Sequence, residues 1–443
     1  MADPAHYSSD EEGEHFIGGA EGVLGDGKVV AELDSEGEGQ PGDSGYESDL
    51  EDDTGGAQEQ EDASIHTFDA HKETVFAVAW SPAHADLVAT GGGDDKAFIW
   101  RVGQDAFEQT GGKTFELLGH TDSVVSLAFN SSGAVLATGG LDGRVKLWES
   151  SSGRNLHTLE GPAEGVEWLA WHPRGDVIIA GSEDFTVWMW NGQNGACMQV
   201  FSGHSGSVRC GCFSPDGKLV VSGGGEGDAS LRIWEPKTGE CLQSIHGHGF
   251  HTEGLTAVAV HPDSTVAISG AEDGSVCVSN IHTGRVVGTL TGHDDSVETA
   301  SFSHVQPVAV TGSVDGKLII WDIATLTSRG VCSHPEGVIK AVCHPSAPLV
   351  YTACLDGVVR CWDLRTGVCV SGRAGHSEGV QDIAVSPDGS LVLSGSDDHT
   401  ARVSLACHQT PSKLVHQAGG RGLRPSLGGC PSDSLHLAGG GTA

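Results

Sequence analysis

The stretch "DGRVKLW", Asp142–Trp148, recurs in varied form eight times along the chain and decides its fold. The other copies read "DDKAFIW", "DFTVWMW", "DASLRIW", "DGSVCVS", "DGKLIIW", "DGVVRCW" and "DHTARVS". Every copy begins with aspartate, neighbouring copies are 41 to 48 residues apart, and six of the eight end in tryptophan. A fixed period of this size indicates a repeat architecture in which each unit packs against its neighbours.

Each copy belongs to a longer unit with the pattern of four short antiparallel strands. A histidine, usually preceded by glycine, lies 22 to 25 residues before seven of the eight aspartates. Two runs of alternating apolar and polar residues come between them, as in "SVVSLAFN" (123–130) and "AVLATGG" (134–140), and a fourth run follows the last position. Because period-two alternation bounded by Gly, Pro and Asp is typical of strands, the unit predicts a four-stranded blade.

The unit resembles the WD40 repeat in the residues that open and close it. Gly119-His120 opens one unit, Asp142 follows, and the dipeptide Trp-Asp stands at Trp321-Asp322 and Trp362-Asp363. One such unit cannot bury its own apolar faces, so the units must pack around a common axis. The resemblance implies an all-β WD40 β-propeller of eight blades over residues 63–406. Seven blades with one irregular unit is the alternative.

The two ends of the repeat region predict how the ring closes. "SIHTFDAH" (Ser64–His71) has the pattern of a fourth strand without the three that should precede it. Val380–Leu405 has the pattern of three strands without a fourth. Pairing of the N-terminal strand with the last blade would complete the eighth sheet and leave no open edge at the junction, where another chain could add.

A repeated polar set is expected to hold the loops of each blade. In this fold an aspartate between the second and third strands faces the Gly-His loop, and a hydroxyl of the second strand and the tryptophan of the third complete the set. The aspartates are Asp94, Asp142, Asp184, Asp228, Asp273, Asp315, Asp356 and Asp398. The histidines are His71, His120, His204, His248, His293, His334 and His376. The hydroxyls are Thr90, Thr138, Ser222, Ser269, Thr311, Thr352 and Ser394, and the tryptophans are Trp100, Trp148, Trp190, Trp234, Trp321 and Trp362.

Hydroxyl, histidine and carboxylate are also the ingredients of a nucleophilic triad. A catalytic site would need one set, whereas this chain repeats it in nearly every unit, so we interpret the sets as structural. The third unit has Gly161-Pro162 in place of Gly-His and Ala180 in place of the hydroxyl. The fifth and eighth units have Ser279 and Ser404 in place of tryptophan. These three blades are expected to be the least rigid.

The charge of the chain indicates its kind of partner. The 443 residues carry a formal net charge of −36, and residues 1–62 hold twenty acidic residues against Lys28 alone. This balance argues against binding nucleic acid, whose phosphates need Lys and Arg, and favours a basic protein segment. No apolar run approaches the roughly 20 residues that cross a bilayer. Since the acidic start also lacks a signal-peptide pattern, we expect a cytosolic or nuclear protein.

The loops that carry the histidines and aspartates lie on one face of a propeller, and such loops carry function. Acidic residues follow the histidine or precede the aspartate in nearly every unit. Each alone could be a solvated surface residue, but together they predict an acidic ring that accepts a Lys/Arg-rich peptide. The predicted partner-binding residues are Glu73, Asp122, Glu164, Glu167, Trp168, Glu183, Glu253, Glu272, Asp294, Asp295, Glu298, Glu336, Glu378 and Asp397. Trp168, in "GVEWLAW", is either a core residue or a stacking anchor.

No other motif in the sequence points to chemistry. It contains no phosphate-binding loop, HExxH motif, nucleophile elbow or metal-spaced Cys/His set. Its 12 cysteines form no CxxC pair and are interpreted as free, mostly buried thiols. We therefore expect a non-enzymatic protein without a metal, cofactor or small-molecule substrate. The arm 1–62, with Ser8, Ser9 and Ser48 as weak kinase-site candidates, and the tail 407–443 are expected to be disordered, and the arm is a second possible contact for a basic partner.

Three further stretches are similar to the angio-associated migratory cell protein family: "TGGGDDKAFIWR" (90–101), "VEWLAWHPRGDVIIAGSEDFTVWMWN" (166–191) and "TGRVVGTL" (283–290). That family includes a fungal chaperone that takes the basic N-terminus of a newly made large-subunit ribosomal protein on an acidic propeller face. The resemblance implies capture of such a segment for ribosome assembly. The alternative is a signalling or cell-migration scaffold, or a substrate adaptor, that links several proteins by different faces.

Overall fold

The computed structural model describes residues 62–103 and 114–407. These residues form 32 β-strands in eight four-stranded antiparallel sheets and no helix, so neither stretch holds a helix able to cross a membrane. The expected eight-bladed β-propeller is confirmed, and the seven-bladed alternative is wrong. The predicted arm 1–62 and tail 407–443 lie outside the described residues, apart from Asp62 and Cys407.

The first four blades follow the order of the chain. Blade 1 consists of β2 (Val75–Trp80), β3 (Leu87–Gly92), β4 (Ala97–Arg101) and β5 (Phe115–Leu117). Blade 2 consists of β6 (Val124–Phe129), β7 (Val135–Gly140), β8 (Val145–Glu149) and β9 (Asn155–Leu159). Blade 3 consists of β10 (Val166–Trp171), β11 (Val177–Ser182), β12 (Thr186–Asn191) and β13 (Cys197–Ser202). Blade 4 consists of β14 (Val208–Phe213), β15 (Val220–Gly224), β16 (Leu231–Trp234) and β17 (Cys241–Ile245).

The remaining blades continue in the same order, and the last one borrows the first strand of the chain. Blade 5 consists of β18 (Leu255–Val260), β19 (Val266–Ala271), β20 (Val276–Asn280) and β21 (Arg285–Leu290). Blade 6 consists of β22 (Val297–Phe302), β23 (Val308–Ser313), β24 (Lys317–Asp322) and β25 (Thr327–Ser333). Blade 7 consists of β26 (Val338–Cys343), β27 (Leu349–Cys354), β28 (Val359–Asp363) and β29 (Cys369–Arg373). Blade 8 consists of β30 (Val380–Val385), β31 (Leu391–Ser396), β32 (Ala401–Leu405) and β1 (Ser64–Phe68).

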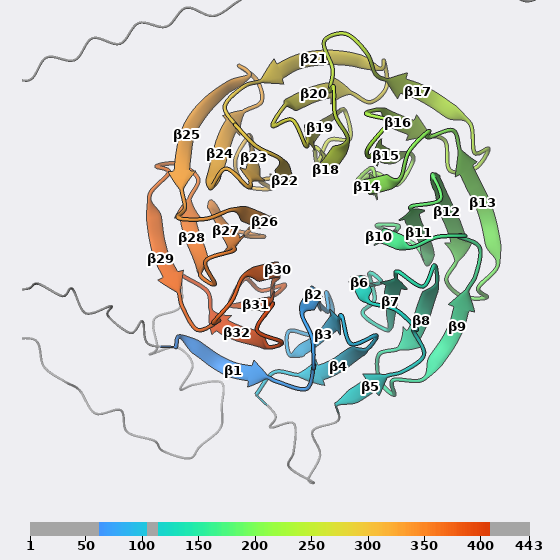
Figure 1. The fold of residues 1–443 in the computed structure, drawn as a ribbon, viewed down its shortest axis with the longest axis vertical. Helices are drawn as coiled ribbons and strands as arrows, with labels where there is room; N and C mark the ends of the chain where they lie inside the picture. The colour runs from blue at the N-terminus through green and yellow to red at the C-terminus, as the bar shows by residue number, and fades with distance from the viewer. Residues whose placement is uncertain (1–61, 104–113, 408–443) are drawn as a thin grey trace, which may run out of the picture. The chain divides into compact units, whose positions relative to one another are not determined.

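The first strand of each blade lies at the centre of the ring and the fourth lies at its rim (Figure 1). Neighbouring inner strands contact one another around the whole ring, from β2 with β6 to β30 with β2. Blades 2 to 7 are antiparallel meanders with their strands in chain order, as the alternating sequence pattern predicts, and blade 8 is completed by β1. Each blade therefore exposes its turns at two ends of the ring.

The ring closes as the sequence predicts. Strand β1 pairs antiparallel with β32, from Ser64 opposite Ser404 to Phe68 opposite Ala401. A second contact joins the inner strands, because Asp382 Oδ2 accepts a hydrogen bond from the backbone N–H of Val78 at 2.8 Å. The first and last blades are thus tied at both the rim and the centre.

The core lies between the blades rather than within one of them. In the described residues, eight clusters of buried apolar side chains form, one for each pair of neighbouring blades. Between blades 2 and 3, for example, Leu147 and Leu159 pack with Leu169 and Ile178. Because each sheet is covered on both faces, middle strands such as β3 are buried along their whole length.

Candidate functional site

The polar set of blade 2 has the predicted composition and is closed. His120 Nδ1–H donates to Asp142 Oδ1 at 3.0 Å, and the hydroxyl of Thr138 lies 2.8 Å from His120 Nε2. Trp148 Nε1–H donates to the same hydroxyl oxygen at 3.0 Å. Burial raises the pKa of Asp142, but the hydrogen bond and charge of His120 outweigh it and hold this pKa below its usual range. We call such a set of Asp, His, hydroxyl and Trp a brace; its buried polar atoms satisfy one another and fix the loop.

Two other blades contain the complete brace. In blade 4 it consists of His204, Asp228, Ser222 and Trp234. In blade 6 it consists of His293, Asp315, Thr311 and Trp321. Blade 8 has no tryptophan and contains the other three members, His376, Asp398 and Ser394. The structure thus brings these predicted residues together in pairs or sets, each within one blade.

Blade 1 contains three members of the brace and not the fourth. His71 lies 2.9 Å from Asp94 and 3.0 Å from the hydroxyl of Thr90. The expectation that Trp100 joins this set is wrong, because its Nε1–H has no hydrogen-bond partner among the described residues. The Trp100 ring instead stacks on Phe68 of the closing strand, with 4.8 Å between ring centroids. Closure of the ring therefore determines how this indole packs.

The histidine predicted for blade 5 is wrong. His248 is exposed, and His251 is the buried residue that lies 2.7 Å from the hydroxyl of Ser269. His251 lies three residues after His248 in a longer loop, and its spacing of 18 residues from the hydroxyl is the same as in blade 2. His251 also contacts Ser275 rather than Asp273, at 2.5 Å. Counting from the hydroxyl instead of the aspartate would have found the right histidine.

Blade 7 also departs from the prediction. His334 lies 2.9 Å from the hydroxyl of Thr352, to which Trp362 Nε1–H donates at 3.1 Å. Asp356 does not bind His334, because Arg360 takes both of its oxygens at 3.0 and 2.6 Å. The second imidazole nitrogen faces a backbone carbonyl instead, at 3.2 Å. An arginine four residues after the aspartate does not by itself predict this change, because Arg232 of blade 4 and Arg402 of blade 8 have the same spacing and leave the His–Asp bond intact.

Blade 3 has no brace, as its sequence predicts. Ala180 replaces the hydroxyl, and Trp190 Nε1–H is buried without a hydrogen-bond partner in the described part of the chain. Asp184 accepts a hydrogen bond from the backbone N–H of Ala163 at 2.9 Å in place of an imidazole. The ring of Trp188 stacks on Trp190 with 6.0 Å between centroids. Apolar contact therefore replaces the polar brace in this blade.

The braces offer no reacting group to a substrate. The hydroxyls of Thr138, Ser222 and Thr311 are fully buried, and each is shared between a histidine and a tryptophan. A nucleophile must reach its substrate, so these sets cannot act as one without breaking the fold. Within residues 62–103 and 114–407 no three His, Cys, Asp or Glu side chains are grouped to hold a metal, and the eleven described cysteines are free.

The turns that carry the brace aspartates and the loops that carry the histidines lie at the same end of the ring, which we call the Asp-turn face. A side chain added at Gly143 would lie 3.0 Å from the carbonyl oxygen of Glu164, so the turn of one blade packs against the loop entering the next. Most predicted partner-binding acids are exposed here, namely Glu73, Asp122, Glu164, Glu183, Glu253, Asp294, Asp295, Glu336 and Glu378. Half-buried are Glu167, Glu272, Glu298 and Asp397.

Basic side chains neutralise part of this face. Glu272 forms an ion pair with Arg209, and Asp294 forms one with Lys317. Among the described residues, the other predicted partner-binding acids form no ion pair with Lys or Arg, whereas the brace aspartates Asp315 and Asp356 pair with Lys317 and Arg360. Arg209 was missed in the sequence, although it follows the first residue of β14 as Glu167 follows the first residue of β10. The negative charge is therefore uneven around the ring.

The strongest unneutralised pair lies in blade 3. Burial raises the pKa of Glu167, and the hydrogen bond and charge of Glu183 raise it further, whereas Arg209 lowers it less. Glu183 is exposed and also borders Gly165, where an added Cβ would lie 3.0 Å from its Oε2 atom. A carboxylate whose pKa is raised by burial and by a second carboxylate attracts a cation.

Trp168 is a core residue, and the expectation that it binds a partner is wrong. Its side chain is buried, and its Nε1–H donates to the backbone carbonyl of Val208 in the next blade at 2.9 Å. The ring fills the space beside Gly181 and Gly211, where an added Cβ would overlap it. Trp168 thus joins blades 3 and 4.

A central cavity of about 620 Å³ runs between the eight inner strands. Glu167 and Glu298 line it together with Arg209 and Lys340, and Lys340 lies 3.8 Å from Asp382. The expected ring of acids is therefore interrupted at the centre by two basic residues.

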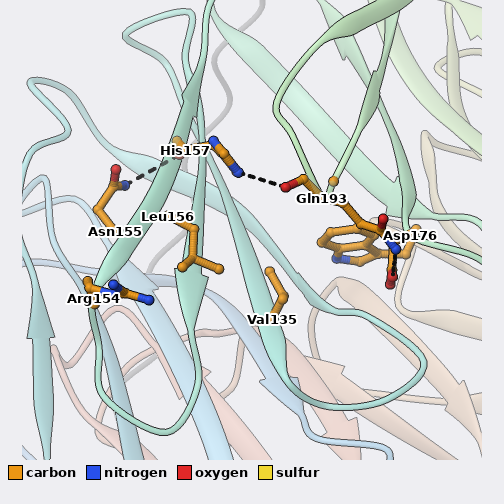
Figure 2. Close-up of a pocket in the computed structure, with 9 residues that line it drawn as sticks. Val135, Arg154, Asn155, Leu156, His157, Asp176 and Gln193 are labelled. Carbon is orange, nitrogen blue, oxygen red and sulfur yellow. Dashed lines mark hydrogen bonds between the residues drawn. The ribbon is translucent and has the colours of Figure 1, made fainter.

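A second concave site lies at the other end of the blades, between blades 2 and 3 (Figure 2). This cavity of about 470 Å³ is lined by Val135, Arg154, Asn155, Leu156, His157, Trp171, Asp176, Gly192 and Gln193. Figure 2 shows Leu156 and Val135 between Arg154 on one side and Asp176 on the other. Asp176 accepts hydrogen bonds from the amides of Asn130 and Gln193 at 3.0 and 3.1 Å, and forms no ion pair within the described stretches. Sequence analysis did not find this pocket, whose residues come from two blades.

Comparison with known families agrees with the repeat pattern. The model of the family "WD domain, G-beta repeat" matches residues 62–101, 111–149, 153–191, 195–235, 239–279, 284–322, 326–363 and 367–403. Human angio-associated migratory cell protein is 35% identical over 373 residues, which are 81% of this chain and 83% of that protein. A WD repeat-containing protein of Schizosaccharomyces pombe is 35% identical over 345 residues, which are 76% of this chain and 85% of that protein.

Solved structures show the same architecture. The crystal structure of Sqt1 from Chaetomium thermophilum, bound to the N-terminus of the ribosomal protein L10, matches with a TM-score of 0.71. The match covers 78% of this chain and 100% of that chain, at 26% sequence identity.

Proposed function

The chain belongs to the WD40 repeat family and, within it, to the family of angio-associated migratory cell protein, and from this premise we propose that it is a non-enzymatic scaffold whose Asp-turn face captures a basic protein segment. We propose further that this segment is the N-terminus of a newly made large-subunit ribosomal protein, held before ribosome assembly. The similarity to Sqt1 bound to the N-terminus of L10 supports this choice of partner. On this proposal the protein acts in the cytosol or nucleus.

The observation that carries the proposal is the pair Glu167 and Glu183. Burial and mutual repulsion raise the pKa of Glu167, which means that its ionised form lacks a sufficient partner in the free protein. An incoming Lys or Arg would supply that partner and lower the energy of both carboxylates. The neighbouring acids of the Asp-turn face would add long-range attraction and speed the encounter with a basic peptide.

The proposal is tested by titrating the full chain with a synthetic peptide of the L10 N-terminus from the same organism, using calorimetry. We expect micromolar or tighter binding at low salt and at least a tenfold loss when the salt is raised about tenfold, because screening weakens exposed charge pairs. The double variant Glu167→Lys/Glu183→Lys should bind at least about a hundredfold more weakly, since each reversal places like charges together.

A matched charge reversal controls for net charge. Glu235 and Glu240 lie in the turn between β16 and β17, at the end of blade 4 opposite its Asp turn. Glu235→Lys/Glu240→Lys should leave the affinity within about threefold, because these carboxylates lie beyond the Asp-turn face. Wild-type binding that is absent or insensitive to salt, or equal losses in the two double variants, would contradict the proposal.

The pocket of Figure 2 favours a second candidate function, a scaffold that joins two proteins by opposite faces. Asp176 offers a carboxylate whose hydrogen-bond donors are neutral amides, beside the apolar side chains of Leu156 and Val135. This chemistry suits a Lys or Arg side chain of a second protein. Proteins that co-purify with the wild type but are lost with Asp176→Asn, while L10 peptide binding is retained, would support the scaffold; an unchanged set of partners would count against it.

A further inference from the structure

One position of the Asp turn differs among the blades in a way that the brace does not explain. The residue after each brace aspartate has a positive φ, and these residues are Asp95, Gly143, Phe185, Ala229, Gly274, Gly316, Gly357 and His399. Glycine adopts this left-handed conformation readily, whereas a residue with a Cβ does so at a cost. Phe185, at φ 71°, is the one large apolar side chain of the set.

The turn also leaves little room for a side chain. At Gly357, for example, an added Cβ would lie 2.9 Å from the carbonyl oxygen of His376 and 3.0 Å from that of Glu378. The equivalent contacts at Gly143 are 3.0 and 3.2 Å. A phenylalanine in such a turn is therefore unfavourable for both conformation and packing, and some other property must account for its presence.

The Phe185 side chain does not contribute to the core that could offset this cost. It is 47% exposed, and it belongs to none of the buried clusters formed by the described residues. Its turn also carries Glu183, which borders Gly165 on one side, while Leu141 of blade 2 borders the same glycine at 3.1 Å and is 36% exposed. Leu141 thus lies near Glu183, and Phe185 follows Glu183 by two residues in the same turn.

We propose that Phe185, together with the exposed Leu141 of blade 2, is an apolar anchor that selects basic segments carrying a bulky aliphatic or aromatic side chain next to their Lys or Arg residues. This inference rests on the proposed capture of a basic segment at the same face. The carboxylates supply attraction that any basic peptide satisfies, and the anchor supplies discrimination among basic peptides, because burying apolar surface rewards one side chain over another. The acidic residues favour a basic segment, and the two apolar side chains favour one that also has a bulky apolar residue.

The test uses the full chain and two ten-residue synthetic peptides with four arginines each, one with a central leucine and one with serine in its place. We expect the wild type to bind the leucine peptide about tenfold more tightly, as for partial burial of one such side chain. In Phe185→Gly this preference should fall below about threefold, while affinity for the serine peptide stays unchanged. Glycine is native at this position in blade 2, so the variant should fold and its Tm should rise by about 2 °C.

Asp95→Gly and His399→Gly are matched controls, since they relieve the same backbone conformation in blades 1 and 8. Both should keep the full leucine preference. A wild type without that preference, or a Phe185→Gly variant that retains it, would overturn the anchor. Failure of the capture proposal is distinct, because then the serine peptide would not bind in a salt-dependent manner and Glu167→Gln would not weaken either complex.

Discussion

Blades 2 and 3 are neighbours with the same strand order, but equivalent positions in the two blades differ in their hydrogen bonds and backbone conformation. In blade 2 the buried hydroxyl of Thr138 joins His120 to Trp148, and every polar atom of the brace has a partner. In blade 3 the equivalent indole of Trp190 has none in the described residues, Phe185 is in a left-handed turn, and Glu167 and Glu183 repel one another. Local rules that stabilise one blade are broken in the next.

The difference supports the proposal that blade 3 carries the binding site, whereas blade 2 stabilises the ring. Proteins violate their own local rules chiefly at functional sites, where other contacts compensate. In blade 3 the compensation is apolar: Trp168 joins it to blade 4, and Trp188 stacks on Trp190. We therefore expect substitutions in blade 2 to change stability and substitutions in blade 3 to change binding.

The largest effect should follow from removing the histidine of the brace in blade 2. His120→Ala leaves Asp142 and Thr138 without a buried partner, and we expect a loss of about 3 kcal/mol in the free energy of unfolding. Pro162→Ala, at the equivalent position of blade 3, should cost less than about 1 kcal/mol, because no brace depends on it. Urea unfolding of both variants measures this contrast, and equal losses would remove the distinction between the blades.

Acid should act on the blades that contain a buried neutral histidine. Burial lowers the pKa of His251 and of His334 to about 4 in the folded protein. Because the unfolded chain binds these protons near pH 6.5, the stability contributed by the neutral form is present above pH 6.5 and is lost as the pH falls towards 4, by about 2 kcal/mol for each histidine.

Hydrogen exchange as a function of pH locates this effect. Between pH 7 and pH 4.5 the amides of β19 in blade 5 and β27 in blade 7 should lose protection before those of β11 in blade 3, which has no such histidine. Earlier loss of protection in β11 would show that the missing brace weakens blade 3 in acid, and that the absence of a buried histidine does not protect it.

Restoring one member of the brace should strengthen blade 3. Ala180→Ser places a hydroxyl beside Trp190 Nε1–H, and we expect a gain of about 1 kcal/mol because a buried donor obtains an acceptor. Ala137→Ser in blade 2 adds a hydroxyl on the face of β7 opposite Thr138, in the apolar cluster between blades 2 and 3, and should be destabilising. Thermal unfolding of the two variants provides the comparison; a loss in both would mean that the apolar packing of blade 3 leaves no room for a hydroxyl.

The smallest effect concerns Glu167, whose pKa is raised by burial. Since the pKa of Glu167 is higher in the folded chain than in the unfolded one, its ionised form opposes folding at neutral pH and its protonation on acidification relieves this. Glu167→Gln should therefore raise stability by about half a kcal/mol at pH 7 and weaken peptide capture, with the gain vanishing as the pH falls. The same difference in unfolding free energy at pH 7 and pH 4 would contradict this assignment.

The sequence predicted what repetition determines and missed what depends on contacts between blades. Eight aspartates at a fixed spacing, with the split eighth unit, were enough for the number of blades and for closure by Ser64–Phe68. The choice of His251 over His248 depended on a longer loop, and the spacing of 18 residues to the hydroxyl could have revealed it.

Other features were not accessible from the repeat. Trp100 does not form its predicted bond, and Phe68 from the closing strand of the neighbouring blade 8 stacks on it. Arg209 neutralises Glu272 across two blades, which no alignment of single units reveals. Phe185 was visible in the copy "DFTVWMW", but its meaning depends on the φ angle and the exposure of the side chain.

Hydrogen–deuterium exchange of the full chain, with and without the L10 N-terminal peptide, tests most directly whether blade 3 carries the binding site. Residues 161–167 and the turn 182–186 should show the largest added protection, with little change in the turn between β16 and β17. Protection spread evenly over the eight Asp turns, or largest at the opposite end of the blades, would contradict the assignment of function to blade 3.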